Sequence, residues 1–154
     1  MGCDIHLTVE KQAKNGKWYA VNLFNAHHQS SWRVQKKNVN WIDTWSIPVA
    51  RNSNYDRFAA LAGVRGHGPK PRGLPNDVSE STRFAVEKWG PDGHSHSWLP
   101  LKDAVKIFFD TEYDENKKEG YVKNSPEYYF FGVDRVTEDP EELDQYRVVF
   151  WFDN

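Results

Sequence analysis

Regular alternation of apolar and polar residues at the start of the chain constrains the fold more than any other feature of the sequence. Four apolar and four polar side chains alternate there: Cys3, Ile5, Leu7 and Val9 with Asp4, His6, Thr8 and Glu10. A period of two predicts a half-buried strand with one apolar face and one exposed polar face. The Asn15-Gly16 pair that follows is typical of a hairpin turn, so we expect Trp18 to Leu23 to return as an antiparallel strand.

Two more strands are expected near the other end of the chain, over Tyr128 to Val136 and over Tyr146 to Phe152. Both segments are dense in aromatic and β-branched residues. Asp139 to Glu142, between them, is interpreted as a turn or a single helical turn. The segment 24–48, which contains His27-His28, is expected to be a long loop with a short strand near Trp41 to Ile47.

Three short helices are expected between these ends, and each is marked by residues typical of a helix start or a helix end. Ser53 or Asn54 caps the first, which runs from Tyr55 to Ala62 before Gly63. Asp77 starts a capping box for the second, which reaches Trp89, and Pro100 opens a third that ends near Phe109. Residues 66–75 and the charged segment 111–125 are expected to be loops.

These elements predict an α+β fold, with an antiparallel sheet made of the N-terminal hairpin and the C-terminal strands and covered by about three short helices. At 154 residues the chain is expected to form a single domain, 1–154. Aromatic residues make up 15% of the sequence and include seven tryptophans. Such large rings can build a core from few residues, and we expect most of the tryptophans to be in it.

The sequence also limits the compartment and the partners that we expect. It has no apolar run long enough to span a bilayer, and Met1 to Asp4 lacks the start of a signal peptide. We therefore expect a soluble, cytoplasmic protein that does not bind membranes. The single cysteine, Cys3, falls on the apolar side of its strand and is interpreted as a small buried residue rather than a nucleophile.

Charge is distributed unevenly along the chain. Residues 51–75 contain five bases and one acid, whereas residues 110–144 contain twelve acids and four bases. The acidic segment argues against a long nucleic acid as partner, while a compact arginine cluster suits a small phosphorylated ligand. We expect Arg51, Arg65 and Arg72, with Asn52, to contact phosphate. Arg57 and Arg83 are on expected helices and are interpreted as solvated or ion-paired.

The segment Gly90 to Trp98 is the best candidate for a functional turn, because it places histidine, serine and aspartate between a Gly-Pro pair and a helix. Two histidines at i and i+2 are a frequent metal-ligand element, and Asp4 and His6 repeat that spacing on a strand. One hypothesis is a zinc or manganese site made of Asp4, His6, Asp92, His94 and His96. The alternative is a helix-entry turn whose serines cap the helix at Pro100 and whose histidines are solvated. Ser95, Ser97 and Trp98 are further candidates for contacts with a ligand.

Four blocks of sequence together resemble a known family. They are Gly2-Cys3-Asp4-Ile5-His6, Arg51-Asn52 leading to Phe58-Ala59-Ala60-Leu61-Ala62-Gly63-Val64-Arg65, Pro71-Arg72-Gly73-Leu74-Pro75, and Asp92-Gly93-His94-Ser95-His96-Ser97. In this order they resemble the small "GCDIH" proteins of bacteriophages and prophages. The resemblance implies a viral protein acting in the host bacterial cytoplasm and does not itself imply an activity. Phages do use small proteins to sequester or destroy the nucleotide signals of bacterial defence.

Three functions follow as hypotheses, and the residues leave open whether the protein is an enzyme. The first is a protein that sequesters a phosphorylated, nucleotide-like molecule without a cofactor. The second is a metal-dependent phosphodiesterase that cleaves such a molecule, with His6, His94 and His96 as catalytic residues and zinc or manganese as cofactor. The third is an inhibitor that binds a host enzyme through exposed aromatic residues. A homo-oligomer is compatible with all three.

Overall fold

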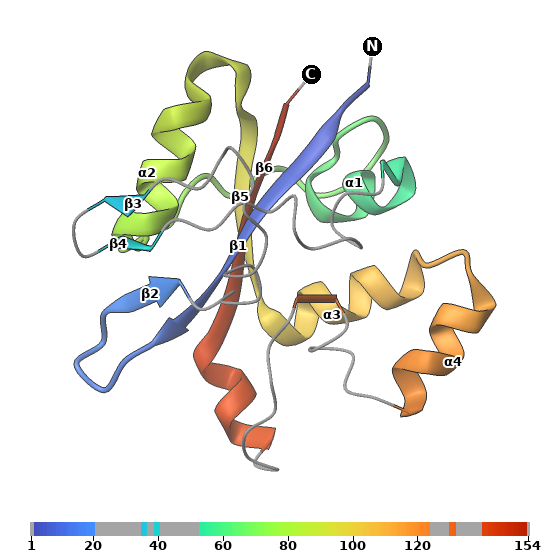
Figure 1. Cartoon of the computed structure of the whole chain (residues 1–154). Coiled ribbons are helices and arrows are strands. Elements are labelled where there is room, and N and C mark those ends of the chain that lie inside the picture. The colour runs from blue at the N-terminus through green and yellow to red at the C-terminus, as the bar shows by residue number, and fades with distance from the viewer. Residues whose placement is uncertain are drawn as a thin grey trace.

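The computed structural model describes residues 2–20, 35–36, 39–40, 53–123, 130–131 and 140–153 of the chain. These residues contain a four-stranded antiparallel sheet. The strand order is β2-β1-β6-β5, so the first and last long strands lie side by side at the centre (Figure 1). Their bounds are Asp4–Gln12 for β1, Trp18–Ala20 for β2, His94–Pro100 for β5 and Tyr146–Asp153 for β6. The expected α+β class is confirmed.

The pairing of β1 with β6 explains how the sheet acquires its apolar face. The register runs from Asp4 opposite Asp153 to Lys11 opposite Tyr146. Cross-strand partners point to the same side of a sheet, so the apolar residues of the two strands share one face. They form a buried core with residues of the covering helices: Ile5, Leu7, Val9, Phe58, Phe108, Val148, Phe150 and Phe152.

Two helices cover this apolar face, α1 (Tyr55–Ala62) and α3 (Leu101–Asp110). The predicted signals of α1 are confirmed: Asn54 Oδ1 accepts a hydrogen bond from Arg57 N, and Gly63 ends the helix with a φ of 68°. The expectation that Arg57 is solvated is wrong. Its guanidinium is buried and donates to Thr111 Oγ1 and to the Phe108 carbonyl, so it links α1 to the end of α3.

The polar face of β1 is not exposed, which corrects the expectation of a half-buried strand. His6, Thr8 and Glu10 are each at most 2% exposed. Helix α2 (Glu80–Trp89) lies on this side of the sheet, opposite to α1 and α3 (Figure 1). Its N-cap is Ser79 rather than Asp77, because Ser79 Oγ accepts from Thr82 N while Asp77 binds an arginine of β6.

Other elements also differ from the prediction. The segment His94 to Trp98 is not a turn but most of β5, preceded by the short 3₁₀ turn η3 (Gly90–Asp92). The expected loop 111–125 contains helix α4 (Glu115–Lys123), and residues 130–131 of the expected strand are helical. The 3₁₀ turn η4 (Pro140–Gln145) agrees with the expected helical turn.

Within the expected loop 24–48, two short strands pair, β3 (Gln35–Lys36) and β4 (Val39–Asn40). The expected strand at 41–47, the end of the returning strand at 21–23 and the His27-His28 pair lie outside the described residues. None of the described helices is both long enough and apolar enough to span a bilayer.

Candidate functional site at the start of β5

A bulge interrupts the pairing of β5 with β6 at the residues that the sequence singled out. His94 lies opposite Phe152 and Ser97 opposite Phe150, so Ser95 and His96 together oppose the single residue Trp151. Ser95 takes a positive φ of 55°, which is uncommon for a residue with a side chain. Bulges redirect side chains and are frequent beside functional sites.

The glycine- and proline-rich loop 66–75 binds along the outer edge of this strand. Arg72 N donates to Ser97 Oγ at 3.0 Å, and Gly73 N donates to the His96 carbonyl at 2.8 Å. Ser97 is 2% exposed, so it holds the loop in place rather than facing a ligand. The loop thereby covers an edge whose backbone groups would otherwise be unpaired.

This docking fixes Arg72 beside Trp98. The Arg72 guanidinium carbon lies 5.0 Å from the centre of the Trp98 ring, which is within cation–π range. Arg72 is exposed, and no carboxylate of the described residues lies within ion-pair distance of it. A guanidinium over an aromatic ring makes no hydrogen bond to it, so its N–H donors stay available for an anion. We refer to Arg72, Ser95, His96 and Trp98 as the β5 site.

His6 lies in the interior rather than at an open site. Its Nε2 is 3.1 Å from Asp153 Oδ2, and Asp153 Oδ1 accepts from Asp4 N. The imidazole lies between two indoles, with its ring centre 4.0 Å from that of Trp89 and 5.9 Å from that of Trp151. With 2% of the residue exposed, this imidazole links β1, β6 and α2 and is closed to a substrate.

The two histidines of β5 diverge at the bulge. His94 pairs with Phe152 and stacks on it with ring centres 6.3 Å apart, on the apolar side of the sheet. The His96 ring instead stacks beside Trp151 at 6.5 Å, on the side that carries His6. The structure therefore does not bring Asp4, His6, His94 and His96 to one point, and Asp92 is exposed on η3. Over the described ranges, no three His, Cys, Asp or Glu side chains gather in a way that could hold a metal ion.

The protonation of His96 follows from its surroundings. Burial, and to a lesser extent the neighbouring His94, lowers the pKa of His96, so the ring is neutral at pH 7. Its Nε2 is buried and has no hydrogen-bond partner within the described part of the chain, and the same holds for Nε1 of Trp151. On the other flank, His94 Nδ1 and Ser95 Oγ are hydrogen-bonded at 2.9 Å.

Arg65 is separated from Arg72 by the sheet. It lies on the side of α1, with its guanidinium carbon 5.6 Å from the centre of the Tyr55 ring. Burial raises the pKa of the Cys3 thiol, and an interaction with Arg65 opposes that shift only in part. Cys3 is fully buried in the core, as expected. Arg51 and Asn52 lie outside the described residues.

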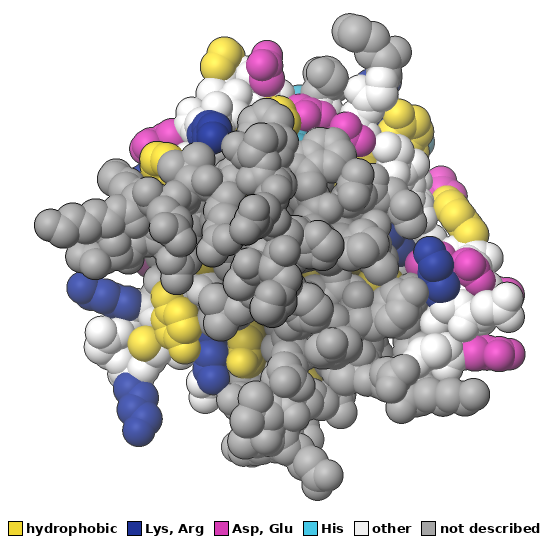
Figure 2. Space-filling view, in the orientation of Figure 1, with side chains coloured by type: hydrophobic (Ala, Val, Ile, Leu, Met, Phe, Trp, Pro, Cys, Tyr) yellow, Lys and Arg dark blue, Asp and Glu magenta, His cyan; other side chains and the backbone are white. Residues whose placement is uncertain are grey.

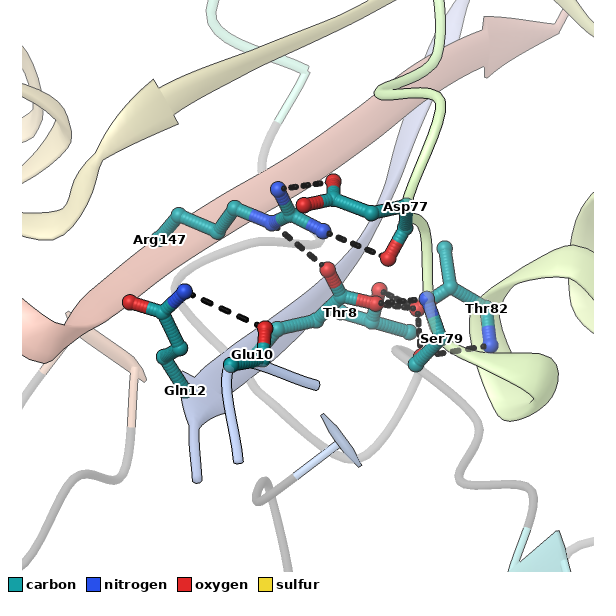
Figure 3. A network of polar contacts seen from close by, with 8 residues as sticks. Thr8, Glu10, Gln12, Asp77, Ser79, Thr82 and Arg147 are labelled. Atoms are coloured by element: carbon teal, nitrogen blue, oxygen red, sulfur yellow. Dashed lines mark hydrogen bonds and ion pairs between the residues drawn. The ribbon is translucent and has the colours of Figure 1, made fainter. Parts of the chain in front are cut away.

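A buried polar cluster centred on Glu10 and Arg147 was not predicted (Figure 3). Glu10 is fully buried, and its Oε1 accepts from Arg147 Nε at 2.8 Å. Its Oε2 accepts from Ser79 N and Thr82 Oγ1, at the start of α2. Arg147 also donates to Asp77, and this contact lowers the pKa of Asp77. The sequence carried one signal of this cluster. Arg147 is the only charged residue in the apolar segment Tyr146 to Phe152, which indicates that it needs a buried partner.

Arg147 also connects this cluster to the β5 site. Its guanidinium carbon lies 3.9 Å from the centre of the Trp18 ring and 6.0 Å from that of Trp98. Arginine and tryptophan thus alternate from Arg72 through Trp98 and Arg147 to Trp18. In Figure 2, basic side chains gather at the lower left, where Figure 1 places the β1–β2 hairpin, while acidic side chains are frequent on the opposite side.

Comparison with known proteins adds no assignment to this geometry. No protein-family model, no curated protein and no solved structure matches the chain.

Proposed function

We propose that this protein binds and retains a phosphorylated, nucleotide-like small molecule at the β5 site. The observation that supports the proposal is the pair of Arg72 and Trp98, in which an exposed guanidinium lies over an indole while two hydrogen bonds anchor the backbone of its loop to β5. A preorganised guanidinium binds phosphate oxygens in a bidentate manner. The half-buried Trp98 and the neutral imidazole of His96 supply surface for the uncharged part of the ligand.

Retention is favoured over cleavage because the residues suited to catalysis are separated. His6 is enclosed and hydrogen-bonded to Asp153, and His94 lies on the opposite face from His96. Metal-assisted hydrolysis needs several ligands that converge on one cation. Binding requires only the anion contact and the aromatic surface, both of which the β5 site presents.

The setting that we propose is a bacteriophage protein that sequesters a nucleotide signal of bacterial defence inside the host cell. The four sequence blocks that resemble phage proteins support it, and contacts between these blocks occur at the beginning of β1 and β5. Ser53, which follows Arg51-Asn52, donates to Asp4, and Arg72 N of the third block donates to Ser97 of the fourth.

Replacing Arg72 by alanine is expected to weaken binding about ten- to 150-fold, the equivalent of roughly 1.5–3 kcal/mol for a hydrogen bond to a charged group. The measurement is calorimetric titration with cyclic mononucleotides, cyclic dinucleotides and isomers of cyclic ADP-ribose. Arg83→Ala is the matched control, because Arg83 is an exposed arginine on α2. Equal affinities of the two variants for every compound that binds would contradict the assignment of the site.

A further inference from the structure

Two enclosed ring nitrogens behind the β5 bulge have no hydrogen-bond partner among the described residues, Nε1 of Trp151 and Nε2 of His96. Trp151 is 1% exposed, so its N–H donor is cut off from solvent as well. Buried polar groups are nearly always paired, and each exception calls for an explanation such as a ligand or a bound water. These two exceptions occur on adjacent rings, stacked 6.5 Å apart with an angle of 20° between their planes.

Their place in the sheet links them to the proposed ligand. His96 and Trp98 are two residues apart on β5, so both side chains leave the same face of the strand. The carbonyl of His96 also anchors Gly73, the residue after Arg72. A molecule whose phosphate binds Arg72 therefore extends naturally toward His96 and the Trp151 indole.

The η3 turn borders the same indole. A Cβ added at Gly93 would lie 3.4 Å from Trp151 Cδ1, the atom bonded to Nε1, and 3.5 Å from Trp89 Cβ. Any side chain at position 93 would therefore pack against this edge of the indole. Gly90, at the other end of the turn, has a φ of 57° that few other residues adopt. Glycines therefore flank the turn that borders the indole.

We propose that the Trp151 and His96 nitrogens form an inner subsite that reads the carbonyl-bearing edge of a nucleobase, as in guanine or uracil. An indole N–H is only a donor and requires an acceptor, which a base carbonyl supplies. His96 Nε2 accepts from the adjacent ring N–H of such a base in one tautomer and donates to the same carbonyl in the other. Adenine has no carbonyl, and each of its ring nitrogens has a single lone pair, so it accepts from only one of the two donors when His96 carries its proton on Nε2, whereas a carbonyl oxygen accepts from both. This inference rests on the proposed function and adds the class of base.

The test is calorimetric titration of the full chain with cyclic GMP and cyclic UMP, against cyclic AMP. We expect at least one of the first two to bind about tenfold more tightly than cyclic AMP, as one buried hydrogen bond implies. Trp151→Phe keeps an aromatic ring but removes the N–H, and it should abolish this preference while Arg72→Ala weakens all three compounds. Equal affinities that all depend on Arg72 would refute the inner subsite and leave the proposed function standing.

A second readout uses the unmodified protein and does not depend on how Trp151→Phe folds. In a ¹⁵N-labelled sample, the indole N–H signal of Trp151 should shift on addition of the preferred nucleotide and stay in place with pyrophosphate, which can occupy only the Arg72 part of the site. An unchanged Trp151 signal at saturation with the preferred nucleotide would overturn the proposal.

Discussion

Replacing Arg147 by methionine is expected to lower the free energy of unfolding by about 3–5 kcal/mol, the usual effect of removing one partner of a buried ion pair. The reason is the environment of Glu10. Its carboxylate is fully buried, and Arg147 is the cation that compensates its charge. Without Arg147 the carboxylate is left with the neutral donors Ser79 N and Thr82 Oγ1. Chemical denaturation of the purified variant measures the loss.

Two controls distinguish a buried pair from an ordinary one. Lys102→Met breaks the contact between Lys102 and Asp144, whose side chains are 70% and 61% exposed respectively. This variant should change the free energy of unfolding by less than about 0.5 kcal/mol. Combining Arg147→Met with Glu10→Gln removes the uncompensated charge and should recover part of the loss. If Arg147→Met were as mild as Lys102→Met, the description of Glu10 as a buried anion would be wrong.

Gly68→Ala is expected to destabilise the protein by about 3 kcal/mol, at the upper end of the range for overpacking. A Cβ at Gly68 would lie 1.8 Å from the carbonyl oxygen of Ala59 and 2.8 Å from its carbonyl carbon. Both are backbone atoms of α1, so they cannot rotate away. The loop must then leave the helix, and Arg72 further along the same loop loses its fixed position. Thermal unfolding and titration of the β5 site report these two effects.

Gly120→Ala provides the comparison for the glycine itself. Gly120 lies inside α4, and an added Cβ would meet no atom within 4 Å. Alanine is favoured over glycine in a helix by up to about 1 kcal/mol, so this variant should be slightly stabilised. A Gly68→Ala variant as stable as Gly120→Ala would show that loop 66–75 does not dock on α1 in solution.

The elements that the sequence predicted correctly are those specified by neighbouring residues. The β1–β2 hairpin depends on the Asn15-Gly16 turn, α1 on Asn54 and Gly63, and β6 on a dense run of β-formers. Each signal is complete within about ten residues. For this reason the α+β class could be predicted before any long-range contact was known.

The errors arose where distant residues determine the structure. His94 to Trp98 contains no β-branched residue, and it becomes a strand because β6 pairs with it. The alternating pattern of β1 predicts that its polar face is exposed to solvent. In the structure this face is buried because α2, which is distant in sequence, covers it. Glu10 and Arg147 are 137 positions apart, so nothing local relates them.

The candidate site shows the same division. Arg72, Ser97 and Trp98, which the sequence suggested as ligand contacts, lie together because the Gly-Pro loop and β5 are close in sequence, but Ser97 is buried and anchors the loop. Ligand binding by Arg72 and Trp98 stays a prediction. The metal site was predicted because Asp4 and His6, and likewise His94 and His96, are two positions apart in the sequence. This spacing within each pair does not determine whether the two pairs lie close together in the fold. The bulge at Ser95 directs His94 and His96 to opposite faces, and a bulge leaves no local signal in this sequence.

The central claim is that the β5 site captures an intact phosphorylated nucleotide. The most direct test is to incubate the protein with the nucleotide panel, remove free ligand, denature the protein with heat and analyse what is released. We expect one compound to be depleted from solution and to return chemically unchanged, in an amount close to one per binding site. At the same protein concentration, Arg72→Ala should capture much less of it. Release of a cleaved product would identify a hydrolase, and absence of depletion across the panel would contradict the account.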